Sequence, residues 1–179
     1  MKRYTVDDIL ELNPCSPYTR RKIRKLWGKR KSLALVSIMK LNIPVEDKLW
    51  VACRLLDRRT SVSWACDCVE RTLPIFEKEL PEDKRPRNAI EVTRAWVAGK
   101  ATLGEVRVTV DAAHDAAYAT YATYATFAAT YAAHAASFVF AAAEAASFAA
   151  AHAAANFAVS NATERTWQFN RMLEYVRNG

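Results

Sequence analysis

The sequence has few residues that break helices. Its 179 residues include only 4 glycines and 6 prolines, while 51% are hydrophobic. So few breakers exclude a loop-rich or disordered chain, and the abundance of alanine favours helices. A chain of this length and apolar content can bury a core of its own. We therefore predict an all-α protein, built as a multi-helix bundle.

Cysteine is scarce, and no export signal is recognisable. The four cysteines are Cys15, Cys53, Cys66 and Cys68, without the CxxC or CxxxH spacing of a zinc site. The N-terminus MKRYTVDDILEL is charged and lacks the apolar core of a signal peptide. We expect free thiols and a cytoplasmic location, because reducing compartments keep thiols reduced. Cys66 and Cys68 are expected to pack as small apolar residues.

Motifs of the common enzyme classes are also absent. The sequence contains no glycine-rich phosphate loop, GxSxG or HExxH pattern. Asp67 and Glu70 are interpreted as ordinary charges on a helix surface. His114, His134 and His152 have no cysteines or paired carboxylates near them, so buried, hydrogen-bonded histidines are the favoured interpretation and their role stays open. We predict a non-catalytic protein with no cofactor and no metal. An enzyme with an unrecognised site is a rival hypothesis.

Capping patterns predict several short helices in the first 100 residues. Thr5 with Asp8 predicts a helix over 6–12, and Ser16-Pro17 predicts one that ends at Gly28. Ser32 is expected to cap a third helix. After the turn at residues 42–44, the apolar spacing predicts the helices 45–55, 61–80 with a kink or split at Pro74, and 87–98 ended by Gly99.

The second half is dominated by alanine and opens with the capping pattern of Thr102 and Glu105. From Ala112 to Ala158 there is no glycine or proline. One straight helix over 103–158 would be about 84 Å long, which is rare in a compact domain of this size. We therefore predict a break near Thr130 to Ser137 and a long alanine-rich helical hairpin. Asn161 and Glu164 are expected to cap a last amphipathic helix, in which one face carries Phe169, Met172, Leu173 and Val176.

Within this half, residues 118–131 read YATYATYATFAATY, with a ring at almost every third position. On a helix each step of three residues turns about 60° backward, so the rings spread over about half the surface. Rings packed over alanines predict core and oligomer packing, with a homodimer as the expected assembly. A membrane helix, an ice-binding face and a base-stacking strip are the alternatives. The polar Thr, Tyr and His content, the drift of the threonines and the lack of cations disfavour them.

Positive charge is concentrated in the first third of the chain. Residues 1–60 hold 15 Lys and Arg against 6 Asp and Glu, whereas 61–110 hold 8 against 8 and 111–179 hold 3 against 5. The densest run is RRKIRKLWGKRK at 20–31, and its helical spacing gives Ile23, Leu26 and Trp27 a common apolar face. We name its eight cations the basic ridge: Arg20, Arg21, Lys22, Arg24, Lys25, Lys29, Arg30 and Lys31.

The basic ridge is a candidate binding site for a partner or for nucleic acid. Such a cluster attracts either phosphates or the acidic surface of a protein, and charge density alone does not separate the two; a merely solvated face is the third interpretation. No recognition-helix turn, zinc finger or RNA-binding fingerprint accompanies it. By charge, we divide the chain into a basic N-terminal helical region at 1–60 and a helical domain at 61–179, which together form one compact unit.

The middle of the chain carries a family pattern. It comprises A-C-D-C-x-E-R-x-L-P-x-F-E and P-x-D-x-R-P-R-x-A-I-E, then an Ala-Trp helix that closes with Gly-Lys, then the alanine-rich tail with regularly spaced rings. This pattern, over roughly residues 45–158, resembles the immunity proteins of bacterial polymorphic toxin systems, the group of the fifth immunity-type domain. Within it, Arg85 and Arg87 are expected to pair with Glu70, Glu77 or Glu91.

The resemblance implies a helical, non-catalytic protein that binds and neutralises a protein target. Relatives also resemble small proteins of phages and mobile elements, so the implied targets are a toxin, a nuclease or a host defence complex with an acidic surface. The basic ridge lies outside the family pattern. A nucleic-acid-binding accessory protein that uses residues 20–31 is therefore the alternative function.

Overall fold

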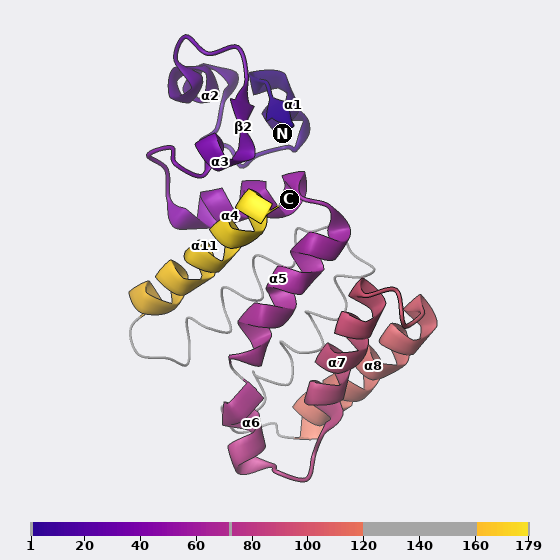
Figure 1. Cartoon of the computed structure of the whole chain (residues 1–179). Helices are drawn as coiled ribbons and strands as arrows, with labels where there is room; N and C mark the ends of the chain where they lie inside the picture. The colour runs from indigo at the N-terminus through magenta and orange to yellow at the C-terminus, as the bar shows by residue number, and fades with distance from the viewer. Residues whose placement is uncertain (1, 72, 120–160, 179) are drawn as a thin grey trace.

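A computed structural model describes residues 2–71, 73–119 and 161–178 of the chain. The predicted hairpin, its break and most of the aromatic run lie outside these residues. The described part is predominantly helical, as predicted (Figure 1). Its elements are β1 (Arg3–Tyr4), α1 (Val6–Glu11), α2 (Arg20–Trp27), β2 (Leu33–Ala34), α3 (Leu35–Ile38), α4 (Val45–Leu55), α5 (Arg58–Glu70), α6 (Leu73–Glu79), α7 (Arg85–Val97), α8 (Leu103–Ala119) and α11 (Asn161–Asn178).

Local capping positions several of these helices as expected. At the start of α1 the Asp8 amide donates to the Thr5 hydroxyl at 3.2 Å, and the Thr5 amide donates to the Asp8 carboxylate at 2.6 Å. Thr102 and Glu105 form the same reciprocal pair at the start of α8. Gly28, which ends α2, has a φ of 60°, a conformation that residues with a side chain rarely adopt.

Two predicted helix starts are wrong, those of α2 and α5. The cap of α2 is Thr19 rather than Ser16, because its hydroxyl accepts from the Lys22 amide. The cap of α5 is Asp57, so this helix begins at Arg58 rather than at Ser61. The predicted split near Pro74 is confirmed, since α5 and α6 are separate helices.

A short sheet replaces the start of the helix that was predicted after Ser32. Leu33 and Ala34 pair antiparallel with Tyr4 and Arg3. The Arg3 guanidinium also donates to the Ser32 carbonyl at 2.7 Å and to its hydroxyl at 3.1 Å. These contacts join residues about thirty positions apart, so a local capping rule does not predict them.

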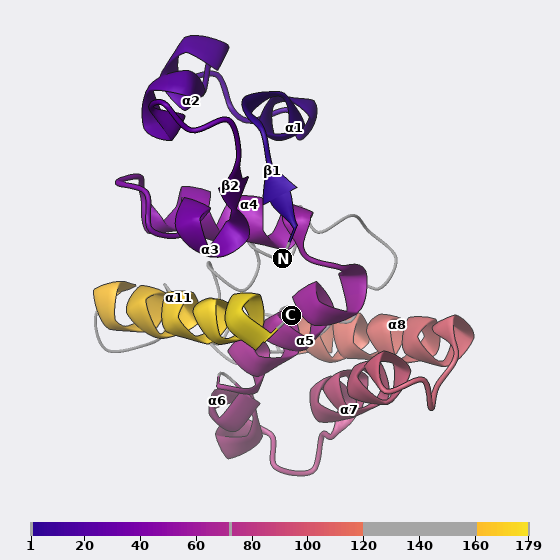
Figure 2. The ribbon, with the colours of Figure 1, turned by 45° about the horizontal axis from the view of Figure 1, so that its top comes forward.

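Helix α5 is the central element of the lower part of the molecule. It packs against α6, α7 and α11, α7 also packs against α8, and α11 reaches α3 and α4 (Figures 1 and 2). Because α5 is covered on several sides, Cys66 and Cys68 are both buried and free, which confirms that they pack in the core. Within the described residues, none of the helices has the length and hydropathy needed to cross a bilayer.

The N-terminal elements form a cap above α4 and α11 (Figure 2). One cluster of buried hydrophobic residues runs from this cap, with Ile23 and Trp27, to Trp64 and Met172 in the lower part. The apolar faces of α2 and α11 therefore contribute to the same core, and the predicted shared face of α11 is confirmed. The division of the chain at residue 60 stays a prediction.

Candidate functional site

The basic ridge lies on α2 and the turn that follows it, at the end of the molecule opposite α6 (Figure 1). Ile23 and Trp27 face inward and are 1% and 2% exposed. The indole nitrogen of Trp27 donates to the Tyr4 carbonyl at 3.3 Å, which anchors α2 to β1. The predicted apolar face is therefore confirmed, and all eight cations of the basic ridge are exposed.

Two cations of the basic ridge have partners near the start of α2. The Arg20 guanidinium forms an ion pair with Asp7 of α1. The Lys22 ammonium lies 4.0 Å from the centroid of the Tyr18 ring. Because both contacts are exposed at the surface, each is expected to add well under about 1 kcal/mol to stability.

Arg30 acts at the other end of the helix. Its guanidinium donates to the Trp27 carbonyl at 2.8 Å and to the Leu26 carbonyl at 3.0 Å. These oxygens belong to the last turn of α2, where carbonyl groups lack partners within the helix. Arg30 is therefore a capping residue, although it was predicted only as part of the binding surface.

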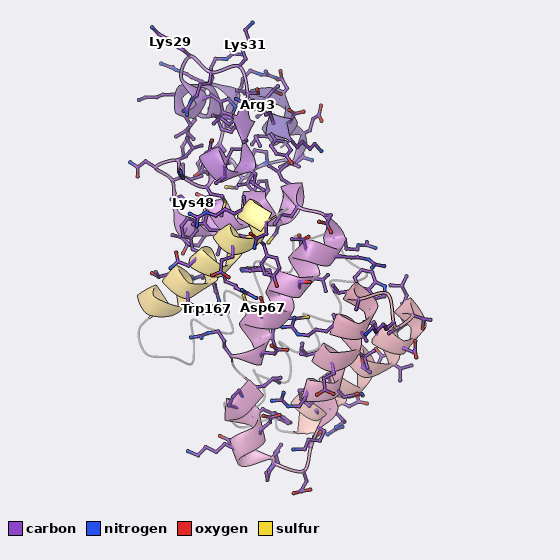
Figure 3. All side chains as sticks on the ribbon, in the orientation of Figure 1. Arg3, Lys29, Lys31, Lys48, Asp67 and Trp167 are labelled. Carbon is purple, nitrogen blue, oxygen red and sulfur yellow. The ribbon has the colours of Figure 1, made fainter. Side chains whose placement is uncertain are left out.

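The other five cations have no such role. Within residues 2–71, 73–119 and 161–178 they form no hydrogen bond, ion pair or ring contact, and they are Arg21, Arg24, Lys25, Lys29 and Lys31. Lys29 and Lys31 project away from the body of the molecule (Figure 3). This end of the protein therefore carries positive charge that the described residues do not neutralise.

An apolar cavity of about 330 Å³ lies beneath α2. Within the described part of the chain, its walls come from five regions: α1 and the loop after it, α2, α3, the residues from 41 through α4, and the first turns of α11. No local sequence pattern indicates this cavity, because it forms only where these distant segments meet. At its edge the Tyr18 hydroxyl donates to Asp47, and burial followed by this carboxylate raises the pKa of Tyr18. Glu46 and Arg165 lie 3.7 Å apart on the same edge.

A charged network joins three helices around Asp67 in the lower part of the molecule (Figure 3). The Asp67 carboxylate accepts from Arg94 of α7 at 2.7 Å, and from Arg171 at 2.6 Å and Tyr175 at 2.8 Å, both of α11. Its side chain is only 11% exposed, so the interpretation of Asp67 as an ordinary surface charge is wrong. Burial, and then this carboxylate, raise the pKa of Tyr175 to about 12.

Neighbouring charges extend the network. Arg94 also donates from Nε and Nη2 to the two carboxylate oxygens of Glu70, and these hydrogen bonds are the main cause of its raised pKa. The Arg71 guanidinium stacks 4.2 Å from the centroid of the Trp167 ring. These partners are internal to the protein, so the network acts as a clamp between α5, α7 and α11.

The predicted pairing of the two arginines at the start of α7 is confirmed for Arg87. Its guanidinium binds Glu77 of α6, with one contact at 2.8 Å, and thereby lowers the pKa of that carboxyl. Arg85 pairs instead with Asp83 at 2.6 Å, two residues before it. Among the described residues, no three His, Cys, Asp or Glu side chains come together as a group that could hold a metal ion.

A protein-family model described as "Imm-5 like putative immunity protein" matches residues 52–175, well over half of the chain. No curated protein and no solved structure matches. The matched range contains the whole Asp67 network and excludes α2 with the basic ridge. The resemblance read from the sequence is thus confirmed, and the structure adds a basic cap to the matched region.

Proposed function

Because the chain belongs to the family of Imm-5 like immunity proteins, we propose that it neutralises a protein target by binding it, without catalysis. The five unpaired cations of the basic ridge form the contact surface in this proposal, and they are the observation that carries it. A surface of one charge sign, held on an anchored helix, is complementary to an acidic face of the target. Occlusion of that face is then enough for neutralisation.

The chemistry of the basic ridge suits carboxylates. Arg21 and Arg24 offer planar guanidinium groups that can bind a carboxylate with two parallel hydrogen bonds. Lys25, Lys29 and Lys31 add flexible point charges around them. Exposed charges of this kind mainly accelerate association and select the partner, so the interface is expected to weaken as salt increases.

Other aspects of the proposal follow from the family and the thiols. The target is a toxin, a nuclease or a defence complex, and a phage or mobile element is the proposed origin of the gene. A cytoplasmic location is supported by four free cysteines, three of them buried. A homodimer built on the alanine-rich segment is also proposed.

A capture experiment in the native host tests the role of the basic ridge. The tagged full chain is compared with the variant Arg21→Glu, Lys25→Glu, Lys29→Glu, and both protein and nucleic acid are quantified. We expect the wild-type chain to capture a protein partner. The amount captured by the variant should be lower by about tenfold or more, because attraction becomes repulsion at three positions.

The matched control reverses three exposed cations elsewhere: Lys78→Glu, Lys84→Glu and Lys100→Glu. This variant has the same net charge as the first and is expected to capture the partner normally. Equal capture by both variants contradicts the proposal. Capture of nucleic acid alone, with a steep dependence on salt, favours the alternative of a nucleic-acid-binding protein.

A further inference from the structure

The cavity beneath α2 is large enough to hold an aromatic side chain. At about 330 Å³ it has roughly twice the volume of a 150 Å³ cavity that binds benzene. Its walls include Leu26 and Trp27 of α2 and Leu49 and Trp50 of α4. An apolar wall of this kind favours a ring or a branched aliphatic group over a polar ligand.

The edge of the cavity carries acceptors that a purely aliphatic ligand would leave unused. Glu46 has a side chain that is 58% exposed, and its 3.7 Å separation from Arg165 is too long for a hydrogen bond. Among the described side chains, Asp47 receives one donor, the Tyr18 hydroxyl, whereas a carboxylate accepts several. A ring that bears its own N–H or O–H group matches this arrangement better than phenylalanine or leucine does.

The cavity and the basic ridge share one helix. Ile23, Leu26 and Trp27 of α2 line the cavity, while Arg24 and Lys25 between them are exposed and unpaired. An acidic protein that binds the outer face of α2 is therefore brought within one helix diameter, roughly 10 Å, of the cavity. Interfaces commonly combine such a charged rim with one aromatic anchor in a pocket.

We infer that the cavity beneath α2 receives a tryptophan or tyrosine side chain from an acidic protein partner. This inference rests on the proposed function, since it adds an anchor to the same interface. The ring fills the apolar cavity, and its N–H or O–H donates to Glu46 or Asp47. The cations of the basic ridge contact acidic residues that flank the anchor.

Binding to the cavity is tested by adding N-acetyl-tryptophanamide as a probe to the full chain. The methyl groups of the protein are observed by NMR. Four of the six isoleucines line the cavity, namely Ile9, Ile23, Ile38 and Ile43. Ile90, buried in α7, is the internal reference. We expect saturable shifts of the four methyl groups at millimolar probe and none at Ile90. No saturable shift, or an equal shift at Ile90, overturns the inference.

Two matched comparisons test how the cavity recognises the ring. The variant Ile43→Trp should fill the cavity and weaken binding of the probe by about tenfold. The control Val108→Trp lies at a position of α8 that is 69% exposed and should leave binding of the probe unchanged. The 1-methylindole analogue of the probe lacks the N–H donor and should bind about threefold to tenfold more weakly. Equal binding of the two probes contradicts the assignment of a hydrogen-bonding ring.

A peptide pair separates this inference from the proposed function. Two acidic peptides differ only in a central tryptophan or alanine, and the first is expected to bind about tenfold more tightly. The charge-reversed variant of the basic ridge should bind both peptides more weakly and should keep the ratio of their two affinities. If the tryptophan and alanine peptides bind with nearly equal affinity, the inferred aromatic anchor is wrong. If the variant of the basic ridge binds the peptides as tightly as the wild-type chain does, the proposed role of the basic ridge is wrong.

Discussion

The variant Asp67→Ala is expected to lose about 3 kcal/mol of the free energy of unfolding, as measured by urea denaturation. The alanine removes a carboxylate that is 11% exposed and accepts from Arg94, Arg171 and Tyr175. Two guanidinium groups and a hydroxyl then lose their shared partner between three helices. Breaking a buried pair typically costs about 3 to 5 kcal/mol, and the lower end applies because both arginines keep access to water.

Two variants isolate the role of the carboxylate. Asp67→Asn keeps the side-chain volume and one acceptor oxygen, so a loss of about 1 to 2 kcal/mol is expected. Glu174→Gln alters the more exposed partner of Arg171 and should cost less than about 1 kcal/mol. If Asp67→Ala is no more destabilising than Glu174→Gln, the carboxylate does not hold the three helices together.

The variant Trp64→Ala is expected to have the larger effect, about 4 kcal/mol. Trp64 is fully buried in α5, and its indole nitrogen donates to the Gln168 carbonyl of α11 at 3.1 Å. Truncation of a buried tryptophan leaves a cavity and typically costs about 3 to 5 kcal/mol. In a chain of this size the melting temperature should fall by about 8 to 16 °C, as measured by calorimetry.

Conservative and peripheral tryptophan variants complete this test. Trp64→Phe keeps most of the ring but removes the indole N–H that donates to the Gln168 carbonyl, so an intermediate loss of about 1 to 3 kcal/mol is expected. Trp96→Ala removes a half-buried tryptophan of α7 and should cost less than Trp64→Ala. A small effect of Trp64→Ala would mean that α5 and α11 are not packed against each other as described.

Local features of the fold were predictable because they depend on a few neighbouring residues. The pairs Thr5–Asp8 and Thr102–Glu105 cap their helices within four residues of sequence. The end of α2 at Gly28 follows from the backbone freedom of glycine alone. The apolar spacing of residues 23, 26 and 27 likewise fixed which face of α2 packs inward and which face bears the cations.

Features that join distant segments were not predictable from local patterns. Asp67 meets Arg171 and Tyr175 across more than one hundred residues, and nothing near Asp67 distinguishes it from an exposed acid. The start of α5 was misplaced because apolar spacing alone placed it, and the capping role of Asp57, a residue type that suits this position, was not recognised. The cavity beneath α2 is the extreme case, since its walls come from five separate regions of the described chain.

The separation between the family-matched region and the basic ridge has a functional consequence. Residues 52–175 contain the Asp67 clamp, whose charges are paired among themselves. The five clustered cations without a partner among the described residues, by contrast, lie at positions 21–31, in the N-terminal cap outside the matched region. We therefore propose that the matched region supplies the scaffold and that the N-terminal cap, which carries the basic ridge, selects the target. Relatives with a different N-terminal cap would then bind different targets.

Photo-crosslinking in the native host identifies which surface of the protein contacts the target. Benzoylphenylalanine is introduced at Lys25 of the basic ridge, and separately at Lys78 of α6 as an exposed control position on the opposite end. The proposed role of the basic ridge predicts a crosslinked protein at position 25 and none at position 78, with the adduct reduced by high salt. A protein adduct only at position 78, or an adduct with nucleic acid alone at position 25, would contradict it.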